Sequence, residues 1–296
     1  MTYDPKRKRL NPGKITKIKQ MEPHEAKREA LLMVRQGRYK PGTLLDKVIQ
    51  LLSTGGVFLE KHVMGLTGIK KRTLQTYRKK NYVDLLPAPL KLGSLIEKPR
   101  VYTLGPIGLA LAQLQNELIP TGYLKSSHDR VTHDVLCNLV YYQIYEAALN
   151  LGYVAILRGK YETTIHNKKN QPILEPDSMV ILTKEGEEKE YPFLIEYHNE
   201  NHSSRAAEKI RKYEHLYQEG YWRNQWHLDT FPPILIATTH RAPAVGYNNE
   251  IQKHLRGAGL RCTYLIKPLR TLLDGSQSAL AWLNLEKNKT INLLKM

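Results

Sequence analysis

The hydrophobic pattern in the first half of the chain predicts three helices in close succession. Apolar pairs recur every three to four residues over 44–52, which is the spacing of one helical face, and the pattern ends in the Ser/Thr/Gly run 53–56. We expect a second short helix over 58–66 and, after the turn Thr67-Gly68, a third helix over 69–81 that is rich in Lys and Arg. Helix, helix, turn and basic helix follow one another in this order in a helix-turn-helix.

Two strand-like segments follow the basic helix. The segments 82–86 and 100–104 are separated by a connection that contains Pro and Gly, so they predict a β-hairpin. Gly105-Pro106 then opens a further helix, because Pro suits the first helical turn. The hairpin would be the wing of a winged helix-turn-helix domain over 41–120. A helical unit without DNA contact is the alternative.

The first forty residues have a different character. Residues 1–40 are strongly basic and show little apolar periodicity, so we expect an arm that cannot bury enough surface to order itself, interrupted by a short helix around 24–36. Such an arm either follows DNA phosphates or serves only to keep the chain in solution, and the sequence favours neither.

The second half of the chain alternates between helical and strand-like segments. A polar stretch over 120–130 precedes this half, and the alternation predicts an α/β domain with a mixed sheet over 130–270, followed by a C-terminal extension over 271–296. A length of 296 residues also favours two domains. The expected elements are a helix over 132–151, strands over 153–158, 173–182 and 191–198, a helix over 203–218, a strand over 233–239, a helix over 248–256 and a strand over 261–267.

The charge of the chain indicates a polyanionic partner. With 45 Lys and Arg against 28 Asp and Glu, the formal net charge is +17, which attracts phosphates and makes nucleic acid the leading partner class. A membrane partner is disfavoured because no long apolar span is present. The two cysteines, Cys137 and Cys262, offer neither a disulfide framework nor a zinc site. With no apolar secretory segment at the start, we expect a cytoplasmic protein.

Two acidic residues on neighbouring strands are the candidates for chemistry. Asp177 follows Glu175-Pro176 at one strand, and Glu196 lies within the apolar run Phe193-Leu194-Ile195 of the next. Burying a carboxylate in such a strand is costly unless it is paired or bound to a metal. Two carboxylates brought together suit a hard cation such as Mg²⁺ or Mn²⁺, which can activate water beside a phosphodiester.

The order of helix, three strands, helix and strand, with Asp177 after a proline and Glu196 on the next strand, resembles the PD-(D/E)xK nuclease-like fold. With the preceding winged helix, the chain resembles the plasmid replication-relaxation family. This resemblance implies a role in plasmid or mobile-element replication, relaxation or mobilisation, with protein partners from replication, mobilisation or transposition. It rests on the segment 101–108, His133, the segments 175–177 and 193–196, Lys209 and Tyr213.

The chain departs from the nuclease pattern at one position. His198 stands where an active nuclease would carry a Lys two residues after the second acid, so the usual cation is missing. Lys209, Arg205 or Lys212 could supply it from the next helix, and Glu146 could extend a metal site formed by Asp177 and Glu196. Alternatively, Asp177 caps a turn and Glu196 pairs with Lys209 or Arg205, which leaves a scaffold without catalysis. The candidate catalytic set is Asp177, Glu196, His198 and Lys209.

The basic helix is the predicted contact with duplex DNA. Its Lys and Arg side chains would set affinity through phosphates, while Thr73 and Gln75 have the hydrogen-bonding groups that read base edges. The function expected is a DNA-binding protein with a metal-dependent nuclease-like domain, or an inactive regulator or assembly factor on the same scaffold. The candidate DNA-binding residues are Lys70, Lys71, Arg72, Thr73, Gln75, Arg78 and Lys79.

Overall fold

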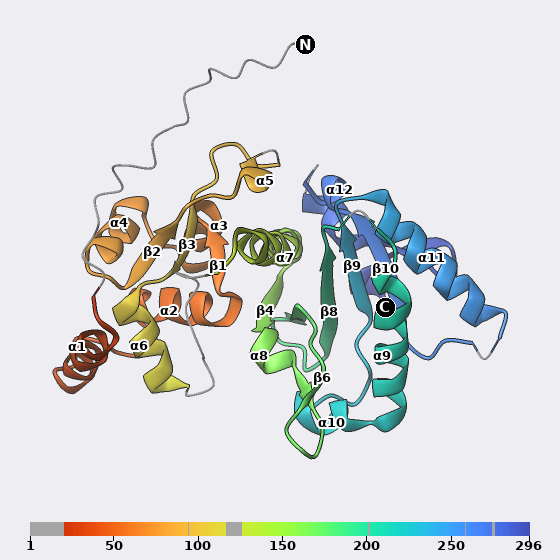
Figure 1. Cartoon of the computed structure of the whole chain (residues 1–296), viewed down its shortest axis with the longest axis horizontal. Coiled ribbons are helices and arrows are strands. Elements are labelled where there is room, and N and C mark those ends of the chain that lie inside the picture. The colour runs from red at the N-terminus through yellow and green to blue at the C-terminus, as the bar shows by residue number, and fades with distance from the viewer. Residues whose placement is uncertain (1–20, 94, 117–125, 201, 258, 274–275) are drawn as a thin grey trace, which may run out of the picture.

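The computed structural model describes residues 21–93, 95–116, 126–200, 202–257, 259–273 and 276–296. The predicted basic arm therefore lies, up to residue 20, outside the described residues. The chain combines helices with a three-stranded antiparallel sheet, a larger mixed sheet and a small two-stranded ribbon (Figure 1). None of the described helices is long and apolar enough to cross a membrane.

The N-terminal half places helices around the three-stranded sheet, whose order is β1-β3-β2. Thr43 caps α2 by accepting a hydrogen bond from the Asp46 backbone N–H, and Gly68 ends α3 in the left-handed region at φ 73°. The elements are α1 (Pro23–Arg35), α2 (Leu44–Gly55), β1 (Val57–Leu59), α3 (Glu60–Thr67), α4 (Lys71–Lys79), β2 (Val83–Leu86), α5 (Leu90–Gly93), β3 (Val101–Leu104) and α6 (Pro106–Gln115).

The predicted second helix was wrong at its start. Val57, Phe58 and Leu59 form strand β1, which pairs with β3 in the register Val57↔Thr103. All three residues of β1 are buried, because this strand lies between the neighbouring helices and α7 (His128–Leu149). Helix α5 lies within the predicted connection and was not predicted, whereas the other elements of this half were predicted to within a few residues.

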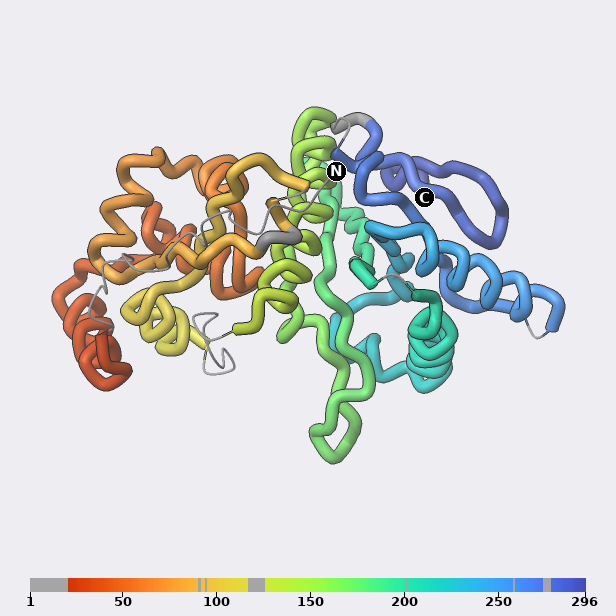
Figure 2. The backbone as a smooth tube through the Cα atoms, turned by 45° about the horizontal axis from the view of Figure 1, so that its top comes forward, coloured from red at the N-terminus to blue at the C-terminus, as the bar shows by residue number. Residues whose placement is uncertain are grey.

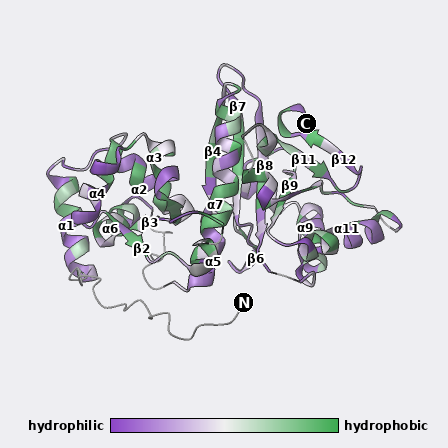
Figure 3. Cartoon of the chain, turned by 90° about the horizontal axis from the view of Figure 1, so that it is seen from above, coloured by the Kyte–Doolittle hydropathy of each residue, from purple (hydrophilic) through white to green (hydrophobic). Residues whose placement is uncertain are grey.

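Helix α7 lies between the two halves and packs against both (Figures 1 and 2). Residues 135–144 are all buried, so this stretch is covered on every side, as in a helix at the centre of a protein. The Asn138 side-chain amide donates hydrogen bonds to the backbone carbonyls of Gly55 at 2.8 Å and Val57 at 2.6 Å. One hydrophobic cluster runs from the N-terminal helices through α7 to the large sheet, and Figure 3 shows hydrophobic residues gathered where α7 meets the strands.

The large sheet has the order β12-β11-β10-β9-β8-β7-β4. Strands β8, β9 and β10 run parallel, and the other pairs are antiparallel. Its elements and their neighbours are β4 (Tyr153–Gly159), α8 (Lys160–Thr163), β5 (Ile165–His166), β6 (Pro172–Leu174), β7 (Ser178–Lys184), β8 (Glu190–His198), α9 (Arg205–Glu219), α10 (Tyr221–Trp226), β9 (Ile234–Thr238), α11 (Arg241–Leu255), β10 (Tyr264–Pro268), α12 (Leu269–Leu273), η2 (Ser276–Leu280), β11 (Ala281–Asn284), β12 (Lys289–Asn292) and η3 (Leu293–Lys295).

The two faces of the large sheet are covered by different helices. Helix α7 packs on one face, and α9 and α11 cover the other (Figure 1). Along β8, Phe193, Ile195 and Tyr197 belong to the cluster around α7. The alternate residues therefore point toward α9 and α11, which places the Glu196 and His198 side chains on that second face.

Three differences from the sequence prediction in this half have a clear physical cause. The strand expected over 173–182 is split into β6 and β7, because Pro176 has no N–H to donate to a strand ladder. Helix α11 begins at Arg241 rather than 248, since Pro243 is tolerated in the first helical turn. The segment 271–296 is not a separate extension, because β11 pairs with β10 and β12 pairs with β11.

Candidate functional site

Asp177 lies immediately before β7 and is held by a backbone amide and a histidine. Its Oδ2 accepts a hydrogen bond from the Tyr197 N–H at 2.8 Å and lies 3.4 Å from Nε2 of His133 on α7. Burial would raise the pKa of the Asp177 carboxyl, but the positive charges of His133 and Lys209 outweigh burial and hold this pKa well below its usual range. Asp177 is therefore an ionised carboxylate fixed in place.

His133 acts as a cation between two carboxylates. Its Nδ1 lies 3.0 Å from Oδ1 of Asp134, and its Nε2 lies 3.2 Å from the Tyr197 carbonyl oxygen as well as close to Asp177. Burial would lower the pKa of the His133 imidazole, but Asp177 and Asp134 outweigh burial and raise it. A protonated imidazole with both nitrogens engaged cannot serve as a general base.

Glu196 is buried and fully paired. Its side chain is 1% exposed, and Nζ of Lys209 on α9 donates to its two carboxylate oxygens at 2.8 and 2.7 Å. The hydroxyl of Tyr213, one helical turn further along α9, donates to the same carboxylate. Burial would lower the pKa of Lys209, but Glu196 and Asp177 raise it. The cost of burying Glu196 is thus offset by an ion pair and a hydroxyl donor.

His198, the residue in the place of the nuclease lysine, is also fully engaged. It is buried, its Nδ1 lies 2.8 Å from Oε1 of Glu200, and its Nε2 lies 2.9 Å from the hydroxyl of Tyr247 on α11. Helices α9 and α11 therefore close over the face of β8 that carries Glu196 and His198. Glu196 and His198 are therefore both buried and bonded to neighbouring side chains within the protein.

The predicted metal site does not fit this arrangement. Within the part of the chain that the structure describes, no three His, Cys, Asp or Glu side chains come together to hold a metal ion. The carboxylates of Asp177 and Glu196 are each engaged by a cationic side chain instead. Glu146 lies about 20 Å along α7 from His133, at 1.5 Å per residue, and is hydrogen-bonded to Tyr142. The inclusion of Glu146 in the metal set was therefore wrong.

Of the three cations considered for this region, Lys209 is the one that reaches Glu196. Lys212 pairs instead with Glu208 on the same helix, at 2.7 Å. Arg205 is exposed at the start of α9.

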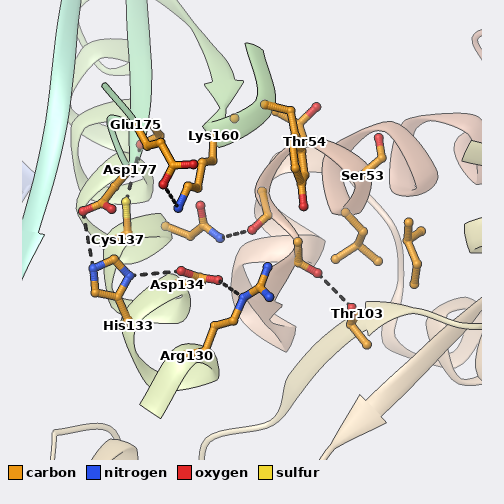
Figure 4. A pocket seen from close by; sticks show the side chains of 18 of the residues that line it. Ser53, Thr54, Thr103, Arg130, His133, Asp134, Cys137, Lys160, Glu175 and Asp177 are labelled. Atoms are coloured by element: carbon orange, nitrogen blue, oxygen red, sulfur yellow. Dashed lines mark hydrogen bonds and ion pairs between the residues drawn. The ribbon is translucent and has the colours of Figure 1, made fainter. Parts of the chain in front are cut away.

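A cavity of about 500 Å³ opens between the end of α2, α7 and the start of α8, with Asp177 in its wall (Figure 4). Two ion pairs line it. Lys160 Nζ lies 3.1 Å from a carboxylate oxygen of Glu175, and Arg130 Nε lies 3.7 Å from one of Asp134. Positive and negative side chains balance in this cavity, and no local pattern in the sequence points to Lys160, Arg130 or Asp134.

Helix α4 presents its basic residues to solvent. Lys70, Lys71, Arg72, Gln75 and Lys79 are exposed, whereas Thr73 and Arg78 are partly buried, and Leu74 anchors the inner face in the core. Two of the cations are paired within the protein. Lys71 Nζ lies 3.3 Å from Glu60, and Arg78 Nε lies 3.9 Å from Asp84. Lys70, Arg72 and Lys79 form no ion pair with any described residue.

Comparison with known proteins agrees with the resemblance seen in the sequence. The family model for replication-relaxation matches residues 54–229, which is more than half of the 296-residue chain. The match runs from the end of α2 through α4, α7 and the two strands that carry Asp177 and Glu196. No curated protein and no solved structure gives a match. The chain therefore belongs to the replication-relaxation family.

Proposed function

We propose that this protein binds duplex DNA through α4 during plasmid or mobile-element replication or relaxation, and that its large sheet is a scaffold that does not cut DNA. Membership of the replication-relaxation family indicates the role in mobile elements. The observation that carries the proposal is the surface of α4, where Lys70, Arg72 and Lys79 are exposed and form no ion pair with any described residue. Such cations are available to neutralise DNA phosphates.

The order of elements around α4 supports a winged helix. Helix α2, strand β1, helices α3 and α4 and the hairpin β2–β3 follow one another along the chain, and the sheet order is β1-β3-β2. In a helix-turn-helix the second helix of the pair enters the major groove, and α4 takes that position. With nine residues, α4 is ~13 Å long, which suits contact with one major groove.

The pairing of the acidic residues supports a sheet that does not cleave DNA. Glu196 is bonded to Lys209 and Tyr213, and His198 is bonded to Glu200 and Tyr247. The second candidate function is a metal-dependent nuclease, and it is favoured by the proximity of Asp177, Glu196 and Lys209 on adjacent elements. For that function the Lys209–Glu196 pair would have to open before a metal could bind.

The DNA-binding proposal is tested by removing the unpaired cations of α4. We expect the triple variant Lys70→Ala/Arg72→Ala/Lys79→Ala to bind duplex DNA more weakly, with a slope of log affinity against log salt that is smaller by about 2.7, or ~0.9 for each phosphate that is no longer neutralised. Fluorescence anisotropy over a salt series measures both quantities. The matched control removes three exposed lysines of the other half and should bind normally: Lys168→Ala/Lys169→Ala/Lys287→Ala. Equal affinity and slope in the α4 variant and the wild type would overturn the proposal.

The scaffold proposal is tested with supercoiled plasmid in the presence of Mg²⁺ or Mn²⁺. We expect the plasmid to be retarded in a gel but to remain intact. Nicking or linearisation by the wild-type protein that is abolished in both Asp177→Ala and Glu196→Ala would establish the nuclease instead.

A further inference from the structure

A second cavity, of about 630 Å³, lies at the carboxyl ends of the parallel strands β8 and β9. Its wall differs in charge from that of the cavity beside Asp177. Arg270 on α12, His240 at the start of α11 and His202 before α9 contribute a guanidinium and two imidazole groups, and the hydroxyl of Thr239 is hydrogen-bonded to that of Tyr197. Ligands of α/β proteins commonly bind at this end of parallel strands.

Arg270 is the central cation of this cavity. Its side chain is exposed and forms no hydrogen bond or ion pair with any described residue. The guanidinium group carries a permanent charge and a planar set of donors that match phosphate oxygens. His240 is the N-cap residue of α11 and makes no capping hydrogen bond with its side chain. The backbone N–H groups of Arg241 and Ala242 begin this 15-residue helix and add a partial positive charge, whereas Pro243 has no N–H.

One acidic residue, Glu200, is also part of the cavity wall, and it is hydrogen-bonded to His198. Its Oε1 lies 2.8 Å from Nδ1 of His198. Burial would raise the pKa of Glu200, but the hydrogen bond from His198 and the charges of His198 and Arg205 outweigh burial and lower it to about 2. Glu200 is thus an ionised carboxylate in the cavity wall that is held by His198 and forms no ion pair with Arg270.

The position of the cavity relates it to α4. Helices α4, α5 and α12 lie along the same edge of the molecule in two views (Figures 1 and 2). The connection between β2 and β3 continues this edge, because Leu95 from that connection lines the cavity. This shared edge is the observation that links the cavity to the DNA proposed to lie on α4.

We propose that this cavity binds a phosphate group, and that its source is the backbone of the DNA held by α4. The inference that DNA supplies the phosphate rests on the proposed function. The inference that the cavity binds a phosphate group rests on the side chains of the cavity itself. The phosphate oxygens would accept hydrogen bonds from the Arg270 guanidinium and from the backbone N–H groups of Arg241 and Ala242, the first two residues of α11.

The experiment compares Arg270→Gln with two controls in DNA binding over a salt series. We expect Arg270→Gln to reduce the salt slope by about 0.9, so that the drop in affinity between 50 and 200 mM salt becomes roughly three- to fourfold smaller than in the wild type. Arg270→Lys keeps the charge and should retain most of the slope. Arg256→Gln removes an exposed arginine from the opposite end of α11 and should have no effect.

A second arm measures binding of inorganic pyrophosphate by titration calorimetry without DNA. If Arg270→Gln abolishes pyrophosphate binding but leaves the DNA salt slope unchanged, the cavity takes the phosphate of a free nucleotide and the DNA source is refuted. If neither quantity changes, the phosphate site itself is refuted. The α4 triple variant separates the two proposals, because normal DNA binding by that variant would refute the function of α4 whatever Arg270 does.

Discussion

Replacing Lys209 by Met should destabilise the protein strongly, although it removes only one charge from the edge of a helix. The Glu196 carboxylate is 1% exposed and receives two of its hydrogen bonds from Lys209 Nζ. Without Lys209, the carboxylate retains the hydroxyl of Tyr213 but has no counter-charge. Leaving one member of a buried ion pair without its partner costs about 3–5 kcal/mol. We expect a decrease of that size in the free energy of unfolding, measured by urea denaturation.

Two further variants separate the buried charge from other effects. Lys212→Met removes a lysine three residues later on α9, where the pair with Glu208 is half exposed, so it should cost less than about 1 kcal/mol. The double variant Glu196→Gln/Lys209→Met removes both charges and should be more stable than Lys209→Met alone. The reasoning is refuted if Lys209→Met and Lys212→Met prove equally mild, since Glu196 would then not depend on Lys209.

Two other substitutions test the packing between the halves. His62 is buried with both ring nitrogens unpaired among the described residues and stacks on Tyr142 with ring centroids 4.1 Å apart, so His62→Phe should stabilise the fold by about 1–3 kcal/mol. Burial lowers the pKa of His62 to about 3 from its usual 6.5. The unfolded chain thus takes up the proton first, and the stability of the wild type should fall by up to about 1.4 kcal/mol per pH unit below 6.5. Urea unfolding at pH 7.5 and 5.5 measures this, and an equally steep decrease in His62→Phe would contradict it. A Cβ on Gly159 would lie 1.9 Å from the Thr54 carbonyl oxygen, so Gly159→Ala should lower the melting temperature, whereas Gly257→Ala, with neighbours no closer than 3.7 Å, should leave it nearly unchanged.

The fold could be predicted where local signals decide structure. Helices α2 and α6 were predicted from apolar positions and from Gly or Pro at their ends, and α4 was predicted from its basic residues after the turn Thr67-Gly68. Strand β1 was not, because three consecutive apolar residues have no period and a buried strand then looks like a buried helix. Strands β11 and β12 were also missed, since β11 is placed by pairing with β10 and β12 by pairing with β11 rather than by a local pattern.

The sequence predicted which residues belong to the candidate site but not most of the contacts that they form. Asp177 and Glu196 stood out as acids at or within apolar strands, and the pairing of Glu196 with Lys209 was one of two alternatives. The contact between His198 and Tyr247 joins residues 49 positions apart, so no local spacing indicates it. For the same reason, charge pattern alone could not separate the unpaired cations of α4 from Lys71, which is paired to Glu60 on a different helix.

The packing of helix α7 against both halves limits how this protein can evolve. Recombination exchanges modules most readily at boundaries where few contacts cross, but here the side chains of one helix complete the cores of both halves. If an N-terminal half from another protein were joined before residue 127, its side chains would not pack against the surface of α7, which fits the present N-terminal half. Under the proposed function, new DNA preferences would therefore arise by substitution on the exposed face of α4 rather than by domain exchange, while the residues of α7 remain constrained from both sides.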